Sequence, residues 1–239
     1  MPSLDRPINS PGALAERLAD VRGRIAAAAD RSGRPPQAVT LVAVTKGHPA
    51  ATAQELIGLG QVDLGENRAR ELVEKCGAIE SGARWHFIGH LQRNKARLVV
   101  GRAVLIHSID SPGLIAELEK EARRRELRQD VLLELNLARE ATRTGALAED
   151  LPALLDALAK APHLRALGLM TMAPADADPE AARPCFAELR RLLGGLTRHG
   201  HLEPRHLSMG MSGDFEVAIE EGATIVRIGT ALLGERAAP

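Results

Sequence analysis

The stretch Val42-Ala43-Val44-Thr45-Lys46 ends a largely apolar run that begins at Ala38. Because the run is continuous, rich in β-branched residues and too short for a capped helix, it predicts a buried strand. A lysine at the exit of such a strand, facing a cleft, can form a Schiff base with an aldehyde. The competing interpretation is a lysine that marks the exit of the strand into solvent.

The chain contains four further lysines, and none of them ends an apolar strand. Lys75, Lys120 and Lys160 fall on the predicted polar faces or ends of helices, and Lys95 follows a polar loop. Lys46 is therefore the candidate for a Schiff-base lysine.

Strands and helices alternate along the rest of the chain. A helical stripe of apolar residues follows Ser10-Pro11 and precedes the first strand. Such alternation requires parallel pairing with right-handed crossovers, and eight units predict a single α/β domain over residues 1–239. We expect a (β/α)8 TIM-type barrel with an extra N-terminal helix, and a doubly wound open sheet is the alternative. The seven later strands, with their exit loops, are predicted at residues 61–67, 84–90, 103–109, 131–136, 164–172, 206–212 and 224–229.

The composition argues against several classes of function. Lys+Arg and Asp+Glu both total 31, so the balanced charge offers no basic surface for nucleic acid and no polybasic membrane signal. One tryptophan, three phenylalanines and no tyrosine leave few rings to stack on bases. The absence of a signal-peptide pattern and of a membrane-length apolar run predicts a soluble cytoplasmic protein. Cys76 and Cys185 are expected to be free thiols, and no residue spacing predicts a metal site.

Glycines and hydroxyl residues follow the last two predicted strands, at the end of the barrel where active sites lie. Ser208-Met209-Gly210-Met211-Ser212-Gly213 leads from one strand into a helix, and Ile228-Gly229-Thr230 leads from the next. Glycine allows close backbone approach, helix N-termini favour an anion, and the hydroxyls of Ser212 and Thr230 add donors. The glycines alone would also suit tight turns, but two such clusters on consecutive strands favour a phosphate site.

Arg227 lies two residues before Gly229 and therefore points to the same side of its strand. An arginine inside the barrel needs an acceptor. A heterocyclic nitrogen would suit it, and the guanidinium would keep that nitrogen unprotonated. The alternative is an internal ion pair with Glu66 or Glu134.

Other residues at or near the predicted strand ends each have two interpretations. His90 suits a ligand contact or an acid–base group, although such a histidine also commonly hydrogen-bonds a loop. His86 and His107 alternate with apolar residues and are expected to pack in the core or under helices. Four methionines could either contact a planar ring or fill gaps in the core: Met170, Met172, Met209 and Met211.

A lysine after the first strand and a phosphate site after the last two would share one rim of the barrel. An aldehyde that carries a phosphate suits this arrangement. Pyridoxal 5′-phosphate (PLP) has both groups, so the sequence predicts PLP as the cofactor.

The chain resembles a known family along most of its length, from the first helix to Arg236, and several segments carry the resemblance. The similarity is to the YggS/PROSC family, the PLP homeostasis proteins, which are related to the barrel domain of alanine racemase. Residues 87–95 and 207–212 are its most specific parts. The matching segments are Val42-Ala43-Val44-Thr45-Lys46, Leu64-Gly65-Glu66-Asn67, residues 85–95, His107-Ser108-Ile109-Asp110, Gly168-Leu169-Met170, residues 207–212 and Val226-Arg227-Ile228-Gly229-Thr230.

The resemblance implies an alanine racemase N-terminal-domain-like barrel with PLP held as an aldimine of Lys46. Arg227 would face the pyridine nitrogen, with the phosphate held nearby. The phosphate would be bound by Ser212, Gly229 and Thr230, with help from the backbone of Met211, and the cofactor would be lined by Asn67, His90 and Met209.

The resemblance also implies a monomer that stores PLP and delivers it inside the cell, with PLP-dependent apoenzymes as acceptors and no robust turnover. A small PLP-dependent amino-acid racemase of fold type III is the first alternative. The missing tyrosine and Arg227 opposite the ring nitrogen argue against it, because a partner base and a protonated ring would both be absent. The second alternative is a phosphate-binding barrel enzyme without PLP, in which Lys46 acts on a sugar phosphate.

Overall fold

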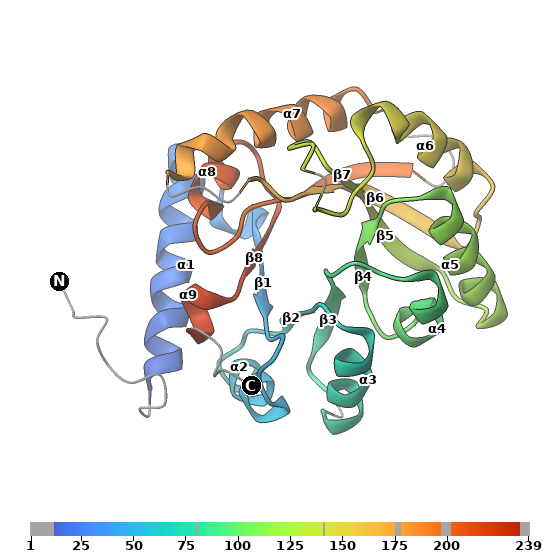
Figure 1. The fold of residues 1–239 in the computed structure, drawn as a ribbon. Helices are drawn as coiled ribbons and strands as arrows, with labels where there is room; N and C mark the ends of the chain where they lie inside the picture. Colours follow the sequence, from blue (N-terminus) through green and yellow to red (C-terminus); the bar gives the residue numbers. More distant parts are fainter. Residues whose placement is uncertain (1–11, 80, 141, 175–177, 197–201, 235–239) are drawn as a thin grey trace.

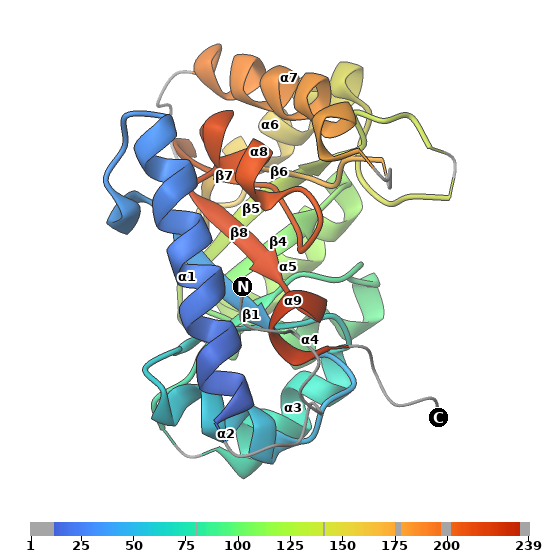
Figure 2. The same cartoon turned by 90° about the vertical axis from the view of Figure 1, so that its left-hand side faces the viewer.

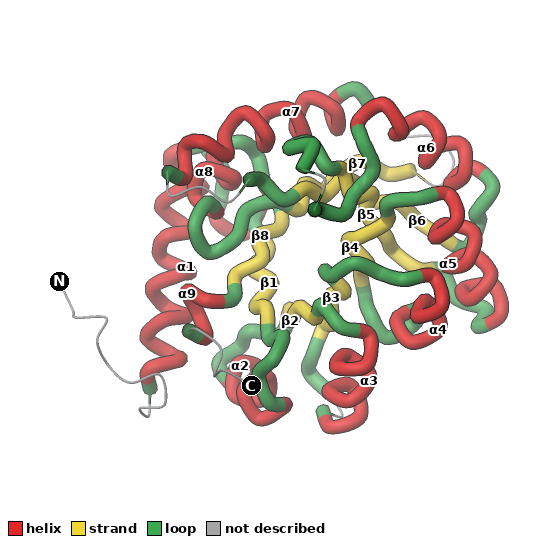
Figure 3. Tube along the Cα trace, viewed as in Figure 1, coloured by secondary structure: helices red, strands yellow, loops and turns green. Residues whose placement is uncertain are grey.

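Eight parallel strands close into a barrel in the computed structural model, which describes residues 12–79, 81–140, 142–174, 178–196 and 202–234. Each strand pairs with the next along the chain, and the last pairs with the first. Figure 3 shows the strands as a ring inside a layer of helices. The predicted barrel is confirmed, and the open-sheet alternative is wrong. The strands are β1 (Thr40–Val44), β2 (Asp63–Glu66), β3 (Arg84–Phe87), β4 (Leu105–Ile109), β5 (Gln129–Leu135), β6 (Leu164–Thr171), β7 (Leu202–Ser208) and β8 (Ile225–Ile228).

Helices connect the strands and cover the outside of the barrel (Figure 1). Short 3-10 turns, such as η2 (Arg93–Lys95) and η4 (Pro179–Ala182), precede some of them, and no helix among the described residues is long and apolar enough to cross a membrane. The α-helices are α1 (Ala13–Arg31), α2 (Ala50–Gly58), α3 (Ala69–Ala78), α4 (Ala96–Val99), α5 (Pro112–Arg124), α6 (Leu151–Ala159), α7 (Arg183–Gly194), α8 (Phe215–Glu220) and α9 (Thr230–Leu233).

The extra N-terminal helix of the prediction is α1. Figure 2 shows it beside α8 and α9. Ser10 and Pro11, where the sequence predicts its start, lie outside the described residues. In the described part the helix begins at Ala13, after Gly12 in a left-handed conformation.

Two apolar layers fill the fold, because successive side chains of a strand face opposite sides. The larger layer lies between the barrel and the helices and includes Leu64, Phe87 and Val226. A smaller cluster fills the lumen, and aliphatic side chains supply it, as the composition predicts. Its buried members are Val42, Leu105, Leu132, Leu167, Met170 and Ile225.

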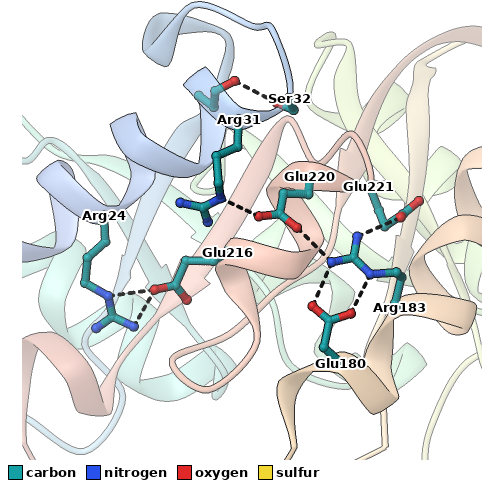
Figure 4. A network of polar contacts seen from close by, with 9 residues as sticks. Arg24, Arg31, Ser32, Glu180, Arg183, Glu216, Glu220 and Glu221 are labelled. Atoms are coloured by element: carbon teal, nitrogen blue, oxygen red, sulfur yellow. Dashed lines mark hydrogen bonds and ion pairs between the residues drawn. The ribbon is translucent and has the colours of Figure 1, made fainter.

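An ion-pair network fixes α8 to its neighbours (Figure 4). Glu220 of α8 accepts from Arg31 of α1 at 2.7 Å and from Arg183 of α7 at 2.7 Å. Arg183 also donates to Glu180 and Glu221. These hydrogen bonds hold the pKa of Arg183 above its usual value. The network therefore ties α1 and α7 to the helix that follows the glycine-rich loop after β7.

We expect Arg183→Ala to lower the free energy of unfolding by about 1 kcal/mol, because one arginine serves three partly exposed carboxylates. That change corresponds to a melting temperature lower by about 2–4 °C, measured by circular dichroism. The matched control is Arg191→Ala, whose arginine pairs with Glu188 on the exposed face of the same helix. Equal melting temperatures for the two variants would show that the network adds nothing to stability.

Candidate functional site

A cavity of about 330 Å³ lies at the carboxyl ends of the strands. Pockets of roughly 300–1,000 Å³ are typical of small-molecule sites, and this end of a barrel is where such sites form. The cavity gathers most of the residues predicted from the sequence. Those that line it are Lys46, Asn67, Met211, Ser212, Arg227, Gly229 and Thr230.

Lys46 reaches the cavity because of the alternation along β1. Val42 belongs to the lumen cluster, Val44 lines the cavity, and Lys46 comes next on the same side. Lys46 itself is half-buried. The side chain of Thr45, one residue earlier, points to the helix side of the strand, where its hydroxyl donates to Glu66.

Lys75 of α3 holds the backbone before Lys46, contrary to its predicted place on a polar helix face. It is 4% exposed, and its Nζ donates to the carbonyl of Thr45 at 2.7 Å and to Glu66 Oε1 at 2.6 Å. The Thr45 hydroxyl also donates to Glu66 Oε1, at 2.5 Å. Burial raises the pKa of Glu66, and the hydrogen bonds from Lys75 and Thr45 oppose that rise.

Glu71 holds the backbone after Lys46. Its Oε1 accepts from the N–H of Gly47 at 2.6 Å and from Lys75 Nζ at 3.0 Å. We call Lys75, Glu66 and Glu71 the Lys75 clamp. The clamp holds both chain neighbours of Lys46, Thr45 and Gly47. It also gives the ammonium of Lys75 three protein acceptors.

Asn67 follows β2 and brings a half-buried side chain with a buried Oδ1 to the cavity. Its Oδ1 has no hydrogen-bond partner among the described residues. Gly89 packs against its backbone, since a Cβ at residue 89 would stand 2.3 Å from the Asn67 carbonyl oxygen. Any side chain at residue 89 would therefore displace the backbone of Asn67.

The predicted phosphate residues meet where the loops after β7 and β8 converge. The N–H of Ala231 donates to Ser212 Oγ at 3.2 Å, which joins the two loops. Thr230 opens α9 and lines the cavity, whereas the N–H groups of Leu232 and Leu233 donate to the carbonyl of Gly229. The N–H of Met211, however, donates to Asp214 Oδ1 at 2.6 Å, so this backbone group is engaged within its own loop.

Arg227 is 4% exposed and is held by neutral acceptors. Its Nη1 donates to Ser208 Oγ at 2.6 Å, and its Nη2 donates to the carbonyl of Thr171 at 3.0 Å. Burial lowers its pKa to about 10, so it stays charged at neutral pH. Among the described residues Arg227 makes no ion-pair contact with Glu66 or Glu134: Glu66 pairs with Lys75, and Glu134 accepts from Thr144 and attracts Arg227 only through its charge.

Two predicted cofactor residues lie away from the cavity lining. Met209 is fully buried in the layer between barrel and helices, because Ser208 before it faces the lumen. His90 is exposed, and its Nδ1 lies 3.4 Å from Asp110 Oδ2. It lines a separate cavity after β3 and β4, together with Arg93 and Asp110.

The structure also adds lining residues that the sequence did not single out for the site. Val44 and Ile88 follow from the same alternation that places Lys46 and so were available from the strand pattern. His48 lies in an irregular loop, where no periodicity signals its direction. The complete addition is Val44, His48, Ile88 and Gly234; Met172, predicted as a possible ring contact, and Gly213, part of the predicted glycine cluster, also line the cavity.

The two cysteines carry no sign of nucleophilic chemistry. Both are free and half-buried, and burial raises the pKa of each thiol, which disfavours the reactive thiolate. Among the described residues there is no group of three or more histidines, cysteines or carboxylates that could hold a metal ion.

Comparison with known proteins gives consistent matches over most of the chain. The family model of the alanine racemase N-terminal domain matches residues 17–237. A pyridoxal phosphate homeostasis protein of Aquifex aeolicus is 45% identical over 92% of this chain and 97% of its own. The protein of the same name from Pseudomonas aeruginosa is 41% identical over 93% of this chain and 96% of its own.

Solved structures agree with the sequence relatives. PipY of Synechococcus elongatus, determined without PLP, is 35% identical and superposes with a TM-score of 0.83 over 92% of this chain and all of its own. The PipY structure with PLP bound superposes with a TM-score of 0.80 over the same shares. The chain therefore belongs to the alanine racemase N-terminal domain family and, within it, to the pyridoxal phosphate homeostasis proteins.

Proposed function

We propose that this protein binds PLP in the cavity at the carboxyl ends of its strands and stores it for delivery. The observation that carries the proposal is that one cavity is lined by Lys46, the hydroxyls of Ser212 and Thr230, and Arg227. The PLP-bound structure of PipY, at 35% identity, supports the same cofactor here. PLP supplies a reactive aldehyde, and the ε-amine of Lys46 would hold it by a reversible Schiff base with loss of water.

The residues present fit each part of the cofactor. The hydroxyls of Ser212 and Thr230, which both line the cavity, suit a phosphate. A buried guanidinium that still has unused donors suits an acceptor nitrogen of the ring. The partnerless Oδ1 of Asn67 suits a ligand donor. His90 and Met209 do not line the cavity, so we assign the cofactor site to the residues that do.

Storage and delivery, rather than turnover, follow from what the cavity offers. The chain has no tyrosine that could serve as a second base. The charged Arg227 would oppose protonation of the ring nitrogen, and an unprotonated ring is a weaker electron sink.

We extend the proposal to a cytoplasmic monomer with PLP-dependent apoenzymes as acceptors. Val104, at 42% exposure, is the one strongly exposed large apolar side chain among the described residues. A surface of this kind does not supply the extended apolar patch of an obligate dimer.

The first test is an absorbance titration of the purified protein with PLP, beside Lys46→Ala and the control Lys95→Ala. We expect a visible Schiff-base band in the parent and the control, and its loss in Lys46→Ala. The reason is that Lys95 lies in η2, outside the cavity lining.

Two results would contradict the proposal. A parent without the band would favour a phosphate-binding enzyme without PLP. Racemisation or transamination of amino acids at an ordinary enzymatic rate, about 10 s⁻¹, would contradict storage and favour the racemase.

The phosphate contacts are tested by Thr230→Val, which removes a hydroxyl while keeping the shape. We expect the Kd for PLP to rise roughly ten- to a hundredfold, since a hydrogen bond to a charged group contributes roughly 1.5–3 kcal/mol. Pyridoxal, which lacks the phosphate, is the internal control and should bind both proteins equally. An equal loss of affinity for the two ligands would remove Thr230 from the phosphate site.

The Lys75 clamp gives a prediction on stability and on the cofactor together. Lys75→Met leaves the buried Glu66 without its cation, which costs about 3–5 kcal/mol of unfolding free energy. We also expect the Schiff-base band to form more slowly, because Thr45 loses its bond to Lys75 and Glu71, which holds Gly47, loses its cation. The matched control is Lys120→Met, which removes an exposed lysine of α5. Melting curves and band-formation rates that are alike in the two variants would contradict the clamp.

A further inference from the structure

A chain of hydrogen-bonded side chains ends at Arg227. His86 Nε2 lies 2.9 Å from Asp63 Oδ1, and His86 Nδ1 lies 3.0 Å from His107 Nε2. His107 Nδ1 lies 2.8 Å from Ser208 Oγ, which accepts from Arg227 Nη1 at 2.6 Å. We call these five residues the lumen chain. The sequence predicts only that the two histidines are buried, and the structure adds that they are connected.

The lumen chain crosses the barrel and runs along it. His107 belongs to β4 and Ser208 to β7, which are not neighbours in the sheet, so their contact crosses the lumen. Asp63 is the first residue of β2, at the end of the barrel opposite the cavity. Arg227 lines the cavity itself. The lumen chain thus connects the two ends of the barrel.

When each imidazole carries one proton, the carboxylate of Asp63 sets the direction of every hydrogen bond in the lumen chain. Arginine has donors only and a carboxylate has acceptors only. Because Ser208 accepts from Arg227, its own hydroxyl hydrogen is free to donate to His107 Nδ1. His107 then donates from Nε2 to His86 Nδ1, and His86 donates from Nε2 to Asp63. Both imidazoles are neutral in this arrangement, and both carry the proton on Nε2.

The surroundings of His107 agree with a neutral ring. The side chain is 0% exposed. Burial holds its pKa well below the usual value, and the neighbouring His86 and Arg227 lower it further. A protonated His107 would put a second cation near Arg227 at a fully buried position.

We infer that Ser208, His107 and His86 are positioning residues that hold Arg227 as a fixed donor toward the cavity, through a one-directional chain anchored at Asp63. The inference rests on the proposed function, because it makes the cavity selective for a ring with an acceptor nitrogen. Two of the five N–H groups of Arg227 have acceptors among the described residues, Ser208 and Thr171. The remaining donors are those that a ligand nitrogen would use.

The test compares PLP with its carbocyclic analogue, in which a CH group replaces the ring nitrogen. The variant is Ser208→Ala, which breaks the lumen chain beside Arg227. The matched control is Ser108→Ala, which removes another fully buried serine hydroxyl, one with no hydrogen-bond partner among the described residues. Full-length proteins are used, and circular dichroism confirms that each is folded.

We expect the parent and Ser108→Ala to prefer PLP over the analogue by about tenfold, and Ser208→Ala to lose most of this preference. A purely structural role would weaken the two ligands equally, so an unchanged preference in Ser208→Ala overturns the inference. Failure of the parent to bind PLP would instead overturn the proposed function.

A second measurement needs neither a variant nor PLP. Long-range ¹H–¹⁵N spectra of the labelled protein report the tautomer and charge of each histidine ring. At pH 8 we expect both rings to carry the proton on Nε2, with Nδ1 as the acceptor. A charged ring, or a proton on Nδ1 in either ring, would overturn the one-directional chain whatever the ligand results.

Discussion

The alternation of side chains in a closed barrel is the constraint on which the rest of the structure depends. Closure pairs every strand on both sides, so a strand cannot slip by one residue without exchanging its lumen and helix faces. That register puts Lys46 after Val44 on the lumen side and Arg227 after Ile225. The chemistry of the cavity is therefore a consequence of strand register as much as of residue type.

Two buried cations near the cavity are stabilised in opposite ways. Lys75, outside the barrel wall, has two carboxylates and a carbonyl for its three ammonium protons. Arg227, inside it, has a hydroxyl and a carbonyl, which satisfy donors without cancelling the charge. The charge of Lys75 is therefore neutralised by protein groups, whereas the charge of Arg227 remains available to a ligand. The difference explains why two neighbouring basic groups have separate uses.

The fold was predictable because its signals are local and repeated: apolar runs, helical stripes and the glycines that end them. Lys46, Ser212 and Thr230 were predictable because they follow such runs directly. Met209 was assigned to the cofactor, yet its single-residue offset from Ser208 turns it to the other face. Lys75 was misplaced because helical periodicity does not report what a long side chain reaches. The contact of His107 with Ser208 spans 101 residues, a separation at which one sequence carries no pairing signal.

Gly89 shows how the barrel changes the meaning of sequence variation. By position it belongs to a loop after β3, where changes are usually tolerated. Its contact with the backbone of Asn67 makes any other residue there a change to the cavity wall. A missense variant at Gly89 would therefore resemble a loss of the binding site while leaving every lining side chain intact. Variant interpretation in this family has to include residues that contact the backbone of a lining residue without lining the cavity themselves.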